Sequence, residues 1–351
     1  MNSSNDQIYA ETLRSVMWIL LLVPICSHAL DPSKMYDEAI RSVMWIITDD
    51  RQASGVLIEK KNGNGLAVTN EHVTKDHKEV RVVFPVRDAY GNLIGERKFY
   101  ADESNQGVLE RLGYATSGRV IAIDPENDLA MVHISGLPET ARPISHDFNN
   151  HAYRGMKPSD PVYILGNPTG RDLWRWTAGH FQGVNERLLH INAGTYGGNS
   201  GGPVLNNQGV LIGILSSGDL LMNTYAIPSE YIEDLYMTLQ VFSVFSIQNK
   251  TQLTVPYQIQ WIEDGEWTEY AIEPSQILPH YYEPPHPQSY PNIRFDYIVD
   301  DEVSVKSYRL KPYIKIFGSD IKERIRYTDG HQYHFKYNPT TKEVDLFDSE
   351  E

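Results

Sequence analysis

The sequence predicts an all-β fold in two domains, with a helix that closes the first domain. Three observations carry this prediction. Short runs rich in Val, Ile and Leu recur between turn residues from about 52 to 227. An apolar pattern with helical spacing starts after Pro228, and the composition changes again after about Lys250. A chain of 351 residues has the length of about two domains.

The first domain is expected to begin with a short helix that leads into a strand, over residues 33–47. Regular short strands with turns between them favour a barrel or a sandwich. We expect these strands at 55–58, 66–69, 80–84, 119–123, 129–134, 162–165, 188–191, 203–205 and 210–215. Ser229 can cap the helix that follows, because apolar residues recur at helical spacing in EYIEDLYMTLQVF.

A second, smaller β domain is predicted to follow. Residues 255–262 and 267–272 alternate apolar and polar side chains around an acidic turn, which indicates a hairpin. Residues 280–291 are too rich in proline for regular structure and predict an extended loop with solvated His280 and His286. Further strands are expected at 293–299, 303–310, 313–317, 325–327, 332–337 and 343–347.

Composition and charge narrow the classes of function. The formal net charge is −15 and no basic patch stands out, so we expect no nucleic-acid partner. The one cysteine, Cys26, excludes disulfides, CxxC redox chemistry and thiolate zinc sites within one chain. We expect no cofactor and no metal.

The N-terminal segment resembles a secretory signal. Residues 16–25 form an apolar run of about 10 residues, about half the length of a membrane span. Ser27-His28-Ala29 fits a cleavage site with small residues. We therefore expect a signal peptide over 1–29 and a secreted or periplasmic protein without a membrane span. Two alternatives stay open: translation from Met17, or a buried helix.

The most informative segment is the nucleophile loop, which we define as Tyr196–Pro203 (YGGNSGGP). A serine among four glycines indicates a tight turn, because glycine tolerates positive φ angles. Such a turn can direct the N–H groups of Gly198 and Ser200 at one point, which is the geometry of an oxyanion hole. An ordinary glycine-rich hairpin is the alternative.

A serine hydroxyl needs a neighbouring base to act as a nucleophile. His72 follows the apolar run LAVT and lies where a strand end meets a polar turn. Asp128 lies directly before the apolar run LAMV, where a carboxylate can orient an imidazole. The alternatives are a surface histidine and a carboxylate that caps a turn, with Asp124 as a competitor for the acidic role.

Together these segments resemble the trypsin-like serine proteases of the chymotrypsin clan. They are most similar in motif style to the bacterial HtrA/Deg and glutamyl-endopeptidase types. The motifs are GLAVTNEHV, NDLAMVHI and GGNSGGPVLNNQGVLIGIL, in the order His, Asp, Ser. VYILGNPTG and NTYAIPSE are similar to further family segments, so the resemblance covers residues 36–245.

The resemblance implies a chymotrypsin-like double β-barrel and peptide-bond hydrolysis without a metal or cofactor. It implies Ser200 as the nucleophile, His72 as the general acid and base, and Asp128 as the residue that orients the imidazole. It also implies an oxyanion hole at Gly198 and Ser200. We therefore expect a signal peptide (1–29), a serine protease domain (36–247) and a C-terminal β domain of no recognised family (252–348).

The substrate pocket is expected from the same resemblance. Its residues would be Gly194, Thr195, Leu215, Ser216, Asn223 and Tyr225. In family members that cleave after Arg or Lys, an aspartate stands at the position of Gly194. Glutamate-selective members carry a histidine on the strand that forms a wall of the pocket, and the corresponding strand here has none. We expect cleavage after small or medium apolar residues.

Two other functions stay open at this stage. A catalytically silent homologue would bind peptides or act as a scaffold. The Tyr- and Trp-rich tail would suit a carbohydrate- or surface-binding protein. The region after 250 lacks the glycine-rich carboxylate-binding loop of a PDZ domain, so we predict none.

Overall fold

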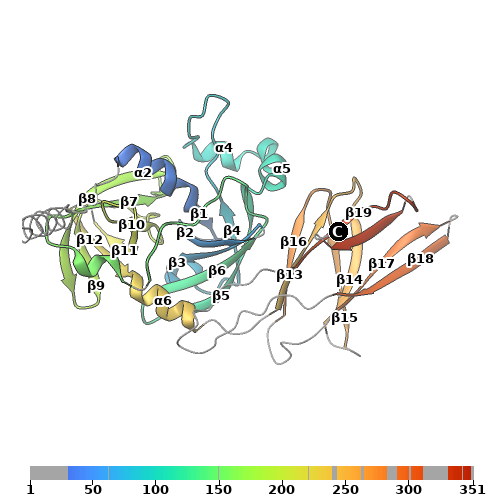
Figure 1. Ribbon diagram of the computed structural model, residues 1–351. Coiled ribbons are helices and arrows are strands. Elements are labelled where there is room, and N and C mark those ends of the chain that lie inside the picture. Colours follow the sequence, from blue (N-terminus) through green and yellow to red (C-terminus); the bar gives the residue numbers. More distant parts are fainter. Residues whose placement is uncertain are drawn as a thin grey trace, which may run out of the picture.

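A computed structural model describes residues 31–61, 63–148, 150–219, 221–238, 243–261, 265–282, 291–299, 302–310, 331–341 and 343–348. Its architecture is two closed six-stranded β-barrels followed by two four-stranded sheets. The barrels lie side by side, and the sheets form a second domain beyond the first barrel (Figure 1). The predicted all-β class and the double barrel are confirmed. The predicted signal peptide, 1–29, lies outside the described residues.

The first barrel closes in the order β1-β2-β3-β6-β5-β4. Its strands are β1 (Val43–Ile47), β2 (Gln52–Lys61), β3 (Asn64–Thr69), β4 (Glu79–Val83), β5 (Ala115–Asp124) and β6 (Leu129–Ser135). The side chains of Met44, Leu57, Val82 and Val132 fill its interior. Closure pairs every strand on both sides, so this apolar core has no exposed sheet edge.

The second barrel closes in the order β10-β11-β12-β9-β8-β7. Its strands are β7 (Pro161–Gly166), β8 (Arg175–Asn185), β9 (Leu188–Asn192), β10 (Pro203–Leu205), β11 (Leu211–Gly218) and β12 (Asn223–Pro228). Ile164, Leu189 and Ile212 are buried inside it. The strand β10 begins just after Ser200, so the nucleophile loop enters this barrel directly.

Helices occupy the entry, the exit and several connections of the two barrels. They are α2 (Pro32–Ala39), η1 (Ile40–Ser42), α3 (Glu71–Thr74), α4 (Arg97–Ala101), α5 (Glu103–Arg111), η2 (Ala152–Gly155) and α6 (Ser229–Met237). The helix and strand expected over 33–47 are confirmed. α6 contacts both β6 and β11, so it packs against both barrels. Pro228, not Ser229, occupies the N-cap position of α6, and the Ser229 side chain makes no capping hydrogen bond.

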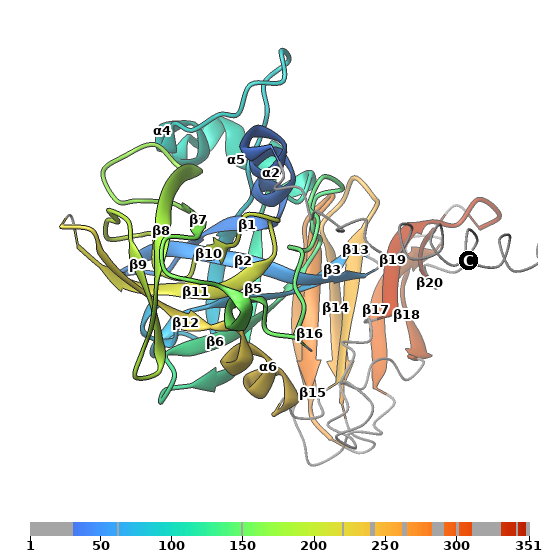
Figure 2. The ribbon, with the colours of Figure 1, turned by 60° about the vertical axis from the view of Figure 1, so that its left-hand side comes forward.

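The C-terminal domain consists of two sheets in the orders β16-β13-β19-β20 and β15-β14-β17-β18. Its strands are β13 (Ser243–Asn249), β14 (Val255–Gln260), β15 (Trp267–Ile272), β16 (Ile277–Tyr282), β17 (Asn292–Val299), β18 (Glu302–Arg309), β19 (His331–Tyr337) and β20 (Val344–Asp348). The two sheets pack face to face, because Phe335 contacts the rings of Tyr257 and Phe295. β16 faces the first barrel at β6 (Figure 2). Ile277 packs there over Gly136.

Several expectations for this domain need correction. The predicted domain limit at 247 falls inside β13, which pairs with β16 and β19. His280 was expected in a solvated loop, but it lies in β16, is 3% exposed, and contacts the Tyr257 hydroxyl at 2.7 Å. Burial lowers the pKa of His280 to about 3. The strands expected at 313–317 and 325–327 lie outside the described residues.

Candidate active site

His72 and Asp128 meet because the strands that carry them are antiparallel neighbours. β3 pairs with β6 in the register Thr69↔Ala130, so the residues just past β3 lie beside those just before β6. His72 lies on the one-turn helix α3, and Asp128 has a left-handed φ of 53°, which aspartate tolerates better than most residues. All residues of β3 and β6 are buried, so the pair of strands is a rigid support.

The Asp128 carboxylate is held by several donors. Its oxygens lie 2.9 Å from His72 Nδ1, and Oδ1 also accepts the His72 backbone N–H at 3.0 Å. Ser216 Oγ donates to Oδ2 at 2.9 Å from the second barrel. Burial raises the pKa of the Asp128 carboxyl, but the hydrogen bonds from His72 and Ser216 outweigh it, so the net pKa lies below its ordinary value.

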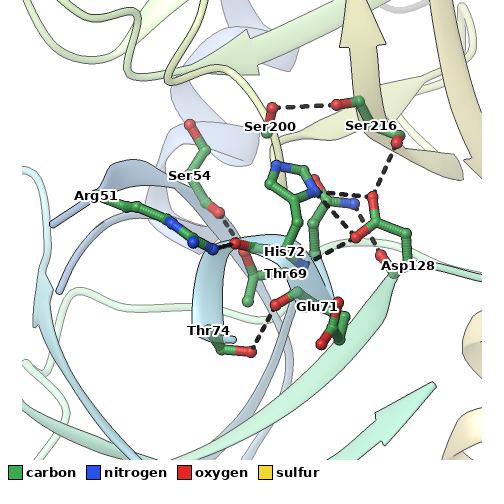
Figure 3. A network of polar contacts seen from close by, with 10 residues as sticks. Arg51, Ser54, Thr69, Glu71, His72, Thr74, Asp128, Ser200 and Ser216 are labelled. Carbon is green, nitrogen blue, oxygen red and sulfur yellow. Dashed lines mark hydrogen bonds and ion pairs between the residues drawn. The ribbon is translucent and has the colours of Figure 1, made fainter. Parts of the chain in front are cut away.

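The imidazole of His72 lies between Asp128 and Ser200 (Figure 3). An ionised carboxylate only accepts hydrogen bonds, so Nδ1 carries the proton in the neutral ring. That tautomer leaves Nε2 unprotonated and able to accept a proton. Arg51 Nη1 donates to the His72 carbonyl, which adds a further contact from the β1–β2 connection.

Ser200 is held by both barrels. Its carbonyl accepts the Ser54 N–H at 2.8 Å, and its hydroxyl donates to the Ser216 carbonyl at 3.1 Å. The nucleophile loop is fastened on either side, because Gly201 N–H donates to the Leu215 carbonyl and Ser54 Oγ donates to the Gly198 carbonyl, each at 2.8 Å.

The glycines of this loop are required by geometry. Gly198 has a φ of +89°, and a Cβ there would lie 2.6 Å from the Asn167 carbonyl oxygen. Among the described residues, the N–H groups of Gly198 and Ser200 donate no hydrogen bond within the chain. Both of these N–H groups are therefore available to an oxygen that develops negative charge.

Asp124 serves a different purpose from Asp128. Its Oδ1 accepts the backbone N–H groups of Glu126 and Asn127 at 3.1 Å, and its Oδ2 accepts Asn127 Nδ2 at 2.6 Å. Asp124 therefore caps the turn that precedes Asp128. This is the capping role that the sequence alone leaves open for Asp128. The structure does not bring Asp124 into contact with His72.

The expected pocket residues are placed unevenly. Thr195 is buried, and its Oγ1 lies 3.0 Å from Thr224 Oγ1. Gly194 lies beside the Met222 side chain, 3.5 Å from the position of an added Cβ, and Tyr225 stacks on His190 with ring centroids 5.0 Å apart.

Three of the expected pocket residues are engaged elsewhere. Leu215 is buried in the core of the second barrel. Asn223 binds Asp219 through its side chain, and the Ser216 hydroxyl is committed to Asp128. These are the contacts that the structure gives the three residues, and their place in a substrate pocket stays a prediction.

Several residues of the site were not anticipated from the sequence. Ser54 Oγ links the Gly198 carbonyl to the Asn167 N–H, at 2.8 and 2.9 Å. Asn167 is fully buried, donates to the Met44 carbonyl and accepts the Trp174 N–H, at 2.9 and 3.0 Å. The available signal was a polar residue within or directly after an apolar run, as in ASGVLI and VYILGN.

The described residues show neither a metal-binding cluster nor a membrane-spanning helix. No group of three or more His, Cys, Asp or Glu side chains in the described ranges could hold a metal ion. Within those same ranges, no helix has both the length and the apolar character needed to cross a membrane.

One known family model matches the part of the chain that carries the candidate catalytic residues. Residues 53–214 match the family model of the trypsin-like peptidase domain. This part of the chain is similar to a trypsin-like peptidase domain and is called the peptidase domain below. The peptidase domain includes the first barrel from β2 onward and the second barrel into β11, so it contains His72, Asp128 and Ser200.

Curated relatives of the peptidase domain are proteases from Staphylococcus aureus. A protein named "Serine protease HtrA-like" is 25% identical in an alignment of length 214, which covers 55% of this chain and 24% of that protein. The protein of the same name from strain USA300 is 24% identical over the same length. The chain therefore spans 24% of the length of these relatives.

Solved structures with a similar chain path are also proteases. The serine endoprotease from Yersinia pestis has a TM-score of 0.43 and 20% identity, over 62% of this chain and 71% of that one. Deg5 has a TM-score of 0.41 and 20% identity, over 58% of this chain and 94% of that one.

Proposed function

We propose that this protein is a serine endopeptidase that hydrolyses peptide bonds through an acyl-enzyme. One observation carries the proposal: an imidazole bound to a carboxylate at 2.9 Å, beside a serine in a glycine-bounded loop. The peptidase domain and the HtrA-like relatives support the same class of reaction. The physiological substrates are protein or peptide segments.

In the proposed mechanism, Ser200 Oγ attacks the carbonyl carbon of the scissile bond while its proton passes to His72 Nε2. The N–H groups of Gly198 and Ser200 stabilise the oxygen anion of the tetrahedral intermediate. His72 then returns the proton to the leaving amine, and water repeats the sequence on the acyl-enzyme. Asp128 stays ionised and stabilises the imidazolium that forms in each half of the reaction.

The proposed preference is for small or medium apolar side chains before the scissile bond. The Met222 side chain lies beside Gly194, and the next residue, Thr195, contacts Thr224; all three side chains are neutral. The nearby Asp219 carboxylate accepts hydrogen bonds from Leu221 and Asn223, so it is already satisfied within its own loop. We take this carboxylate as held within its own loop, so that a cationic side chain next to Gly194 would meet neutral side chains.

The test of the reaction is labelling with a fluorophosphonate, followed by cleavage profiling of a peptide library. The wild type should label at Ser200 and cleave after Ala, Val, Leu or Met. Ser200→Ala should abolish labelling and lower kcat by several orders of magnitude, and a double variant with His72→Ala should be scarcely worse.

The outcomes of this test separate the alternatives. Folded wild-type protein that neither labels nor cleaves would favour the silent homologue. Cleavage mainly after Arg, Lys or Glu would contradict the proposed apolar specificity but not the proposed peptidase activity.

We also propose that the protein is exported. The support is the sequence pattern over residues 16–29, which ends in a small-residue cleavage signature. Protein purified from the source organism should begin near Leu30. An intact Met1 on cytoplasmic material would contradict export.

A further inference from the structure

The connection between β4 and β5 extends from the first barrel onto the second. It carries α4 and α5, and its segment around Ile94–Tyr100 contacts the loop that follows β7. Leu173 N–H donates to the Gly95 carbonyl at 2.8 Å, and Trp174 Nε1 donates to the Ile94 carbonyl at 3.0 Å. An element of one barrel therefore holds a loop of the other.

The centre of this contact is the guanidinium of Arg97, the first residue of α4. Its Nη2 donates to the carbonyls of Asn167 and Pro168, both at 2.8 Å, and its Nε donates to the Arg171 carbonyl at 3.0 Å. Nη1 donates to Gln52 Oε1 at 3.0 Å. The group also lies over the Trp45 ring, 4.7 Å from its centroid, so the fork is fixed from both barrels.

The loop that Arg97 holds lies directly against the nucleophile loop. Thr169 follows the two carbonyls that Arg97 binds, and its N–H donates to the Gly197 carbonyl at 2.7 Å. In a trans peptide the C=O and the next N–H point in opposite directions. Fixing the Gly197 carbonyl toward Thr169 therefore directs the Gly198 N–H away from Thr169, as a proposed oxyanion donor must be.

The position of Gly198 is restricted by close contacts with the loop that Arg97 holds. A Cβ on it would lie 2.6 Å from the Asn167 oxygen and 2.8 Å from the Thr169 nitrogen, so its Cα rests on this loop. A shift of residues 167–169 would be transmitted to the Gly197–Gly198 peptide. Glycine has a wide range of accessible φ and ψ angles, so this peptide needs an external partner to hold one orientation.

We infer that Arg97 is a positioning residue for the oxyanion hole, which it sets through residues 167–169 and the Thr169–Gly197 hydrogen bond. This inference rests on the proposed endopeptidase function. Arg97 touches neither the substrate nor His72 or Ser200. Its contribution is to the orientation of one N–H group, and so to the transition state more than to substrate binding.

The test compares Arg97→Gln and Arg97→Lys with Lys98→Gln. Lys98 is the exposed neighbour of Arg97 on α4, so its replacement removes the same charge without touching the loop. Loss of one oxyanion donor lowers kcat by about 10²-fold or more, so Arg97→Gln should lower kcat by about 10²-fold and leave KM nearly unchanged. Arg97→Lys should retain only part of the activity. Its ammonium group keeps the charge but cannot reproduce the planar set of donors of the guanidinium.

A peptidyl trifluoromethyl ketone provides a second measurement. Ser200 Oγ adds to its carbonyl carbon and the serine proton passes to His72, which leaves a hemiketal oxygen anion in the oxyanion hole. The affinity of Arg97→Gln for this ketone should fall by the same factor as kcat. The affinity for the intact peptide of the same sequence, measured before cleavage occurs, should not change. Lys98→Gln should match the wild type in its affinity for the ketone and for the peptide.

Amide hydrogen exchange across Gly197–Ser200 decides the structural part without any need for activity. Exchange there should be faster in Arg97→Gln than in the wild type and Lys98→Gln, at a temperature where all three proteins are fully folded. Equal exchange, or a raised KM with unchanged kcat, would overturn the role of Arg97. A wild type without peptidase activity would refute the proposed function, while the exchange result would still decide whether Arg97 orients the loop.

Discussion

At the scale of single residues, the nucleophile loop requires glycine at position 201 and has room for a side chain at position 197. Gly201 has a φ of +83°, and a Cβ there would lie 2.0 Å from the Ser54 carbonyl oxygen. Gly197 has nothing within 4 Å of an added Cβ. Because both glycines belong to the same loop, a substitution at Gly197 is a matched control for the same substitution at Gly201.

We expect Gly201→Ala to lower the free energy of unfolding by about 2–4 kcal/mol, from backbone strain and the collision with Ser54. Gly197→Ala should change it by less than about 0.5 kcal/mol. Urea unfolding followed by tryptophan fluorescence measures both. Equal stability of the two variants would show that the loop relaxes at Gly201.

Asp128 makes stability depend on pH with a defined sign. Its pKa is lower in the folded chain than the ordinary value of 3.8, so folding favours the ionised form. The resulting stabilisation is complete above the unfolded pKa and is lost as the pH falls through the folded pKa.

We therefore expect the wild type to lose more stability than Asp128→Asn between pH 6 and pH 3. The measurement is chemical unfolding at several pH values, with Asp124→Asn as a neighbouring control. A parallel decline in the wild type and Asp128→Asn would mean that the carboxylate contributes nothing to folding in this range.

The sequence could predict the candidate catalytic residues of the site better than the residues that support them. His72, Asp128 and Ser200 each stand at the end of a run whose pattern is visible in one stretch of chain, and the structure gathers them in one place. Ser216 was expected in the pocket, but its hydroxyl faces Asp128. The direction of that side chain depends on a partner 88 residues away in the other barrel, which no local pattern encodes.

At the scale of elements, Asn167 is the buried polar connection between β1 and the loop after β7. Asn167→Ala would leave the Trp174 N–H without its acceptor and the Met44 carbonyl without this donor. We expect the free energy of unfolding to fall by about 2–4 kcal/mol, because a buried polar group without a partner costs about 1–3 kcal/mol.

The matched control is Asn185→Ala, at the exposed end of β8. Thermal and urea unfolding of both variants measure the difference. If Asn167→Ala proves as stable as Asn185→Ala, an internal water has replaced the amide.

Most strands were predictable because their apolar runs are short and bounded by turn residues, but α4 and α5 were missed. Only Leu109 is buried in α5 and only Tyr100 in α4. So few apolar positions produce no helical period, and Gly107 weakens the pattern further. These helices owe their place to contacts such as those of Arg97, which join distant parts of the chain.

At the scale of the whole molecule, the division between the domains lies between α6 and β13. The predicted limit at 247 and a cut near Lys250 would leave β13 attached to the barrels without β16 or β19. A strand with two open edges is prone to pair with other chains.

We expect a protein of residues 31–238 to be folded and monomeric, and one of residues 31–250 to associate. Size-exclusion chromatography with light scattering distinguishes them, and near-ultraviolet circular dichroism reports the barrel packing. Unfolding of the shorter protein would show that the contact of Ile277 with Gly136 belongs to the core of the first barrel.

The pairing of β13 with β19 sets an order of events during synthesis on the ribosome. The two strands are parallel neighbours, although β13 starts at Ser243 and β19 ends at Tyr337. The peptidase barrels are complete in sequence once α6 has emerged, whereas β13 must wait for the last part of the chain before its sheet can close. Translation that stops early would therefore release finished barrels that carry unpaired strands, which are a target for chaperones and proteases.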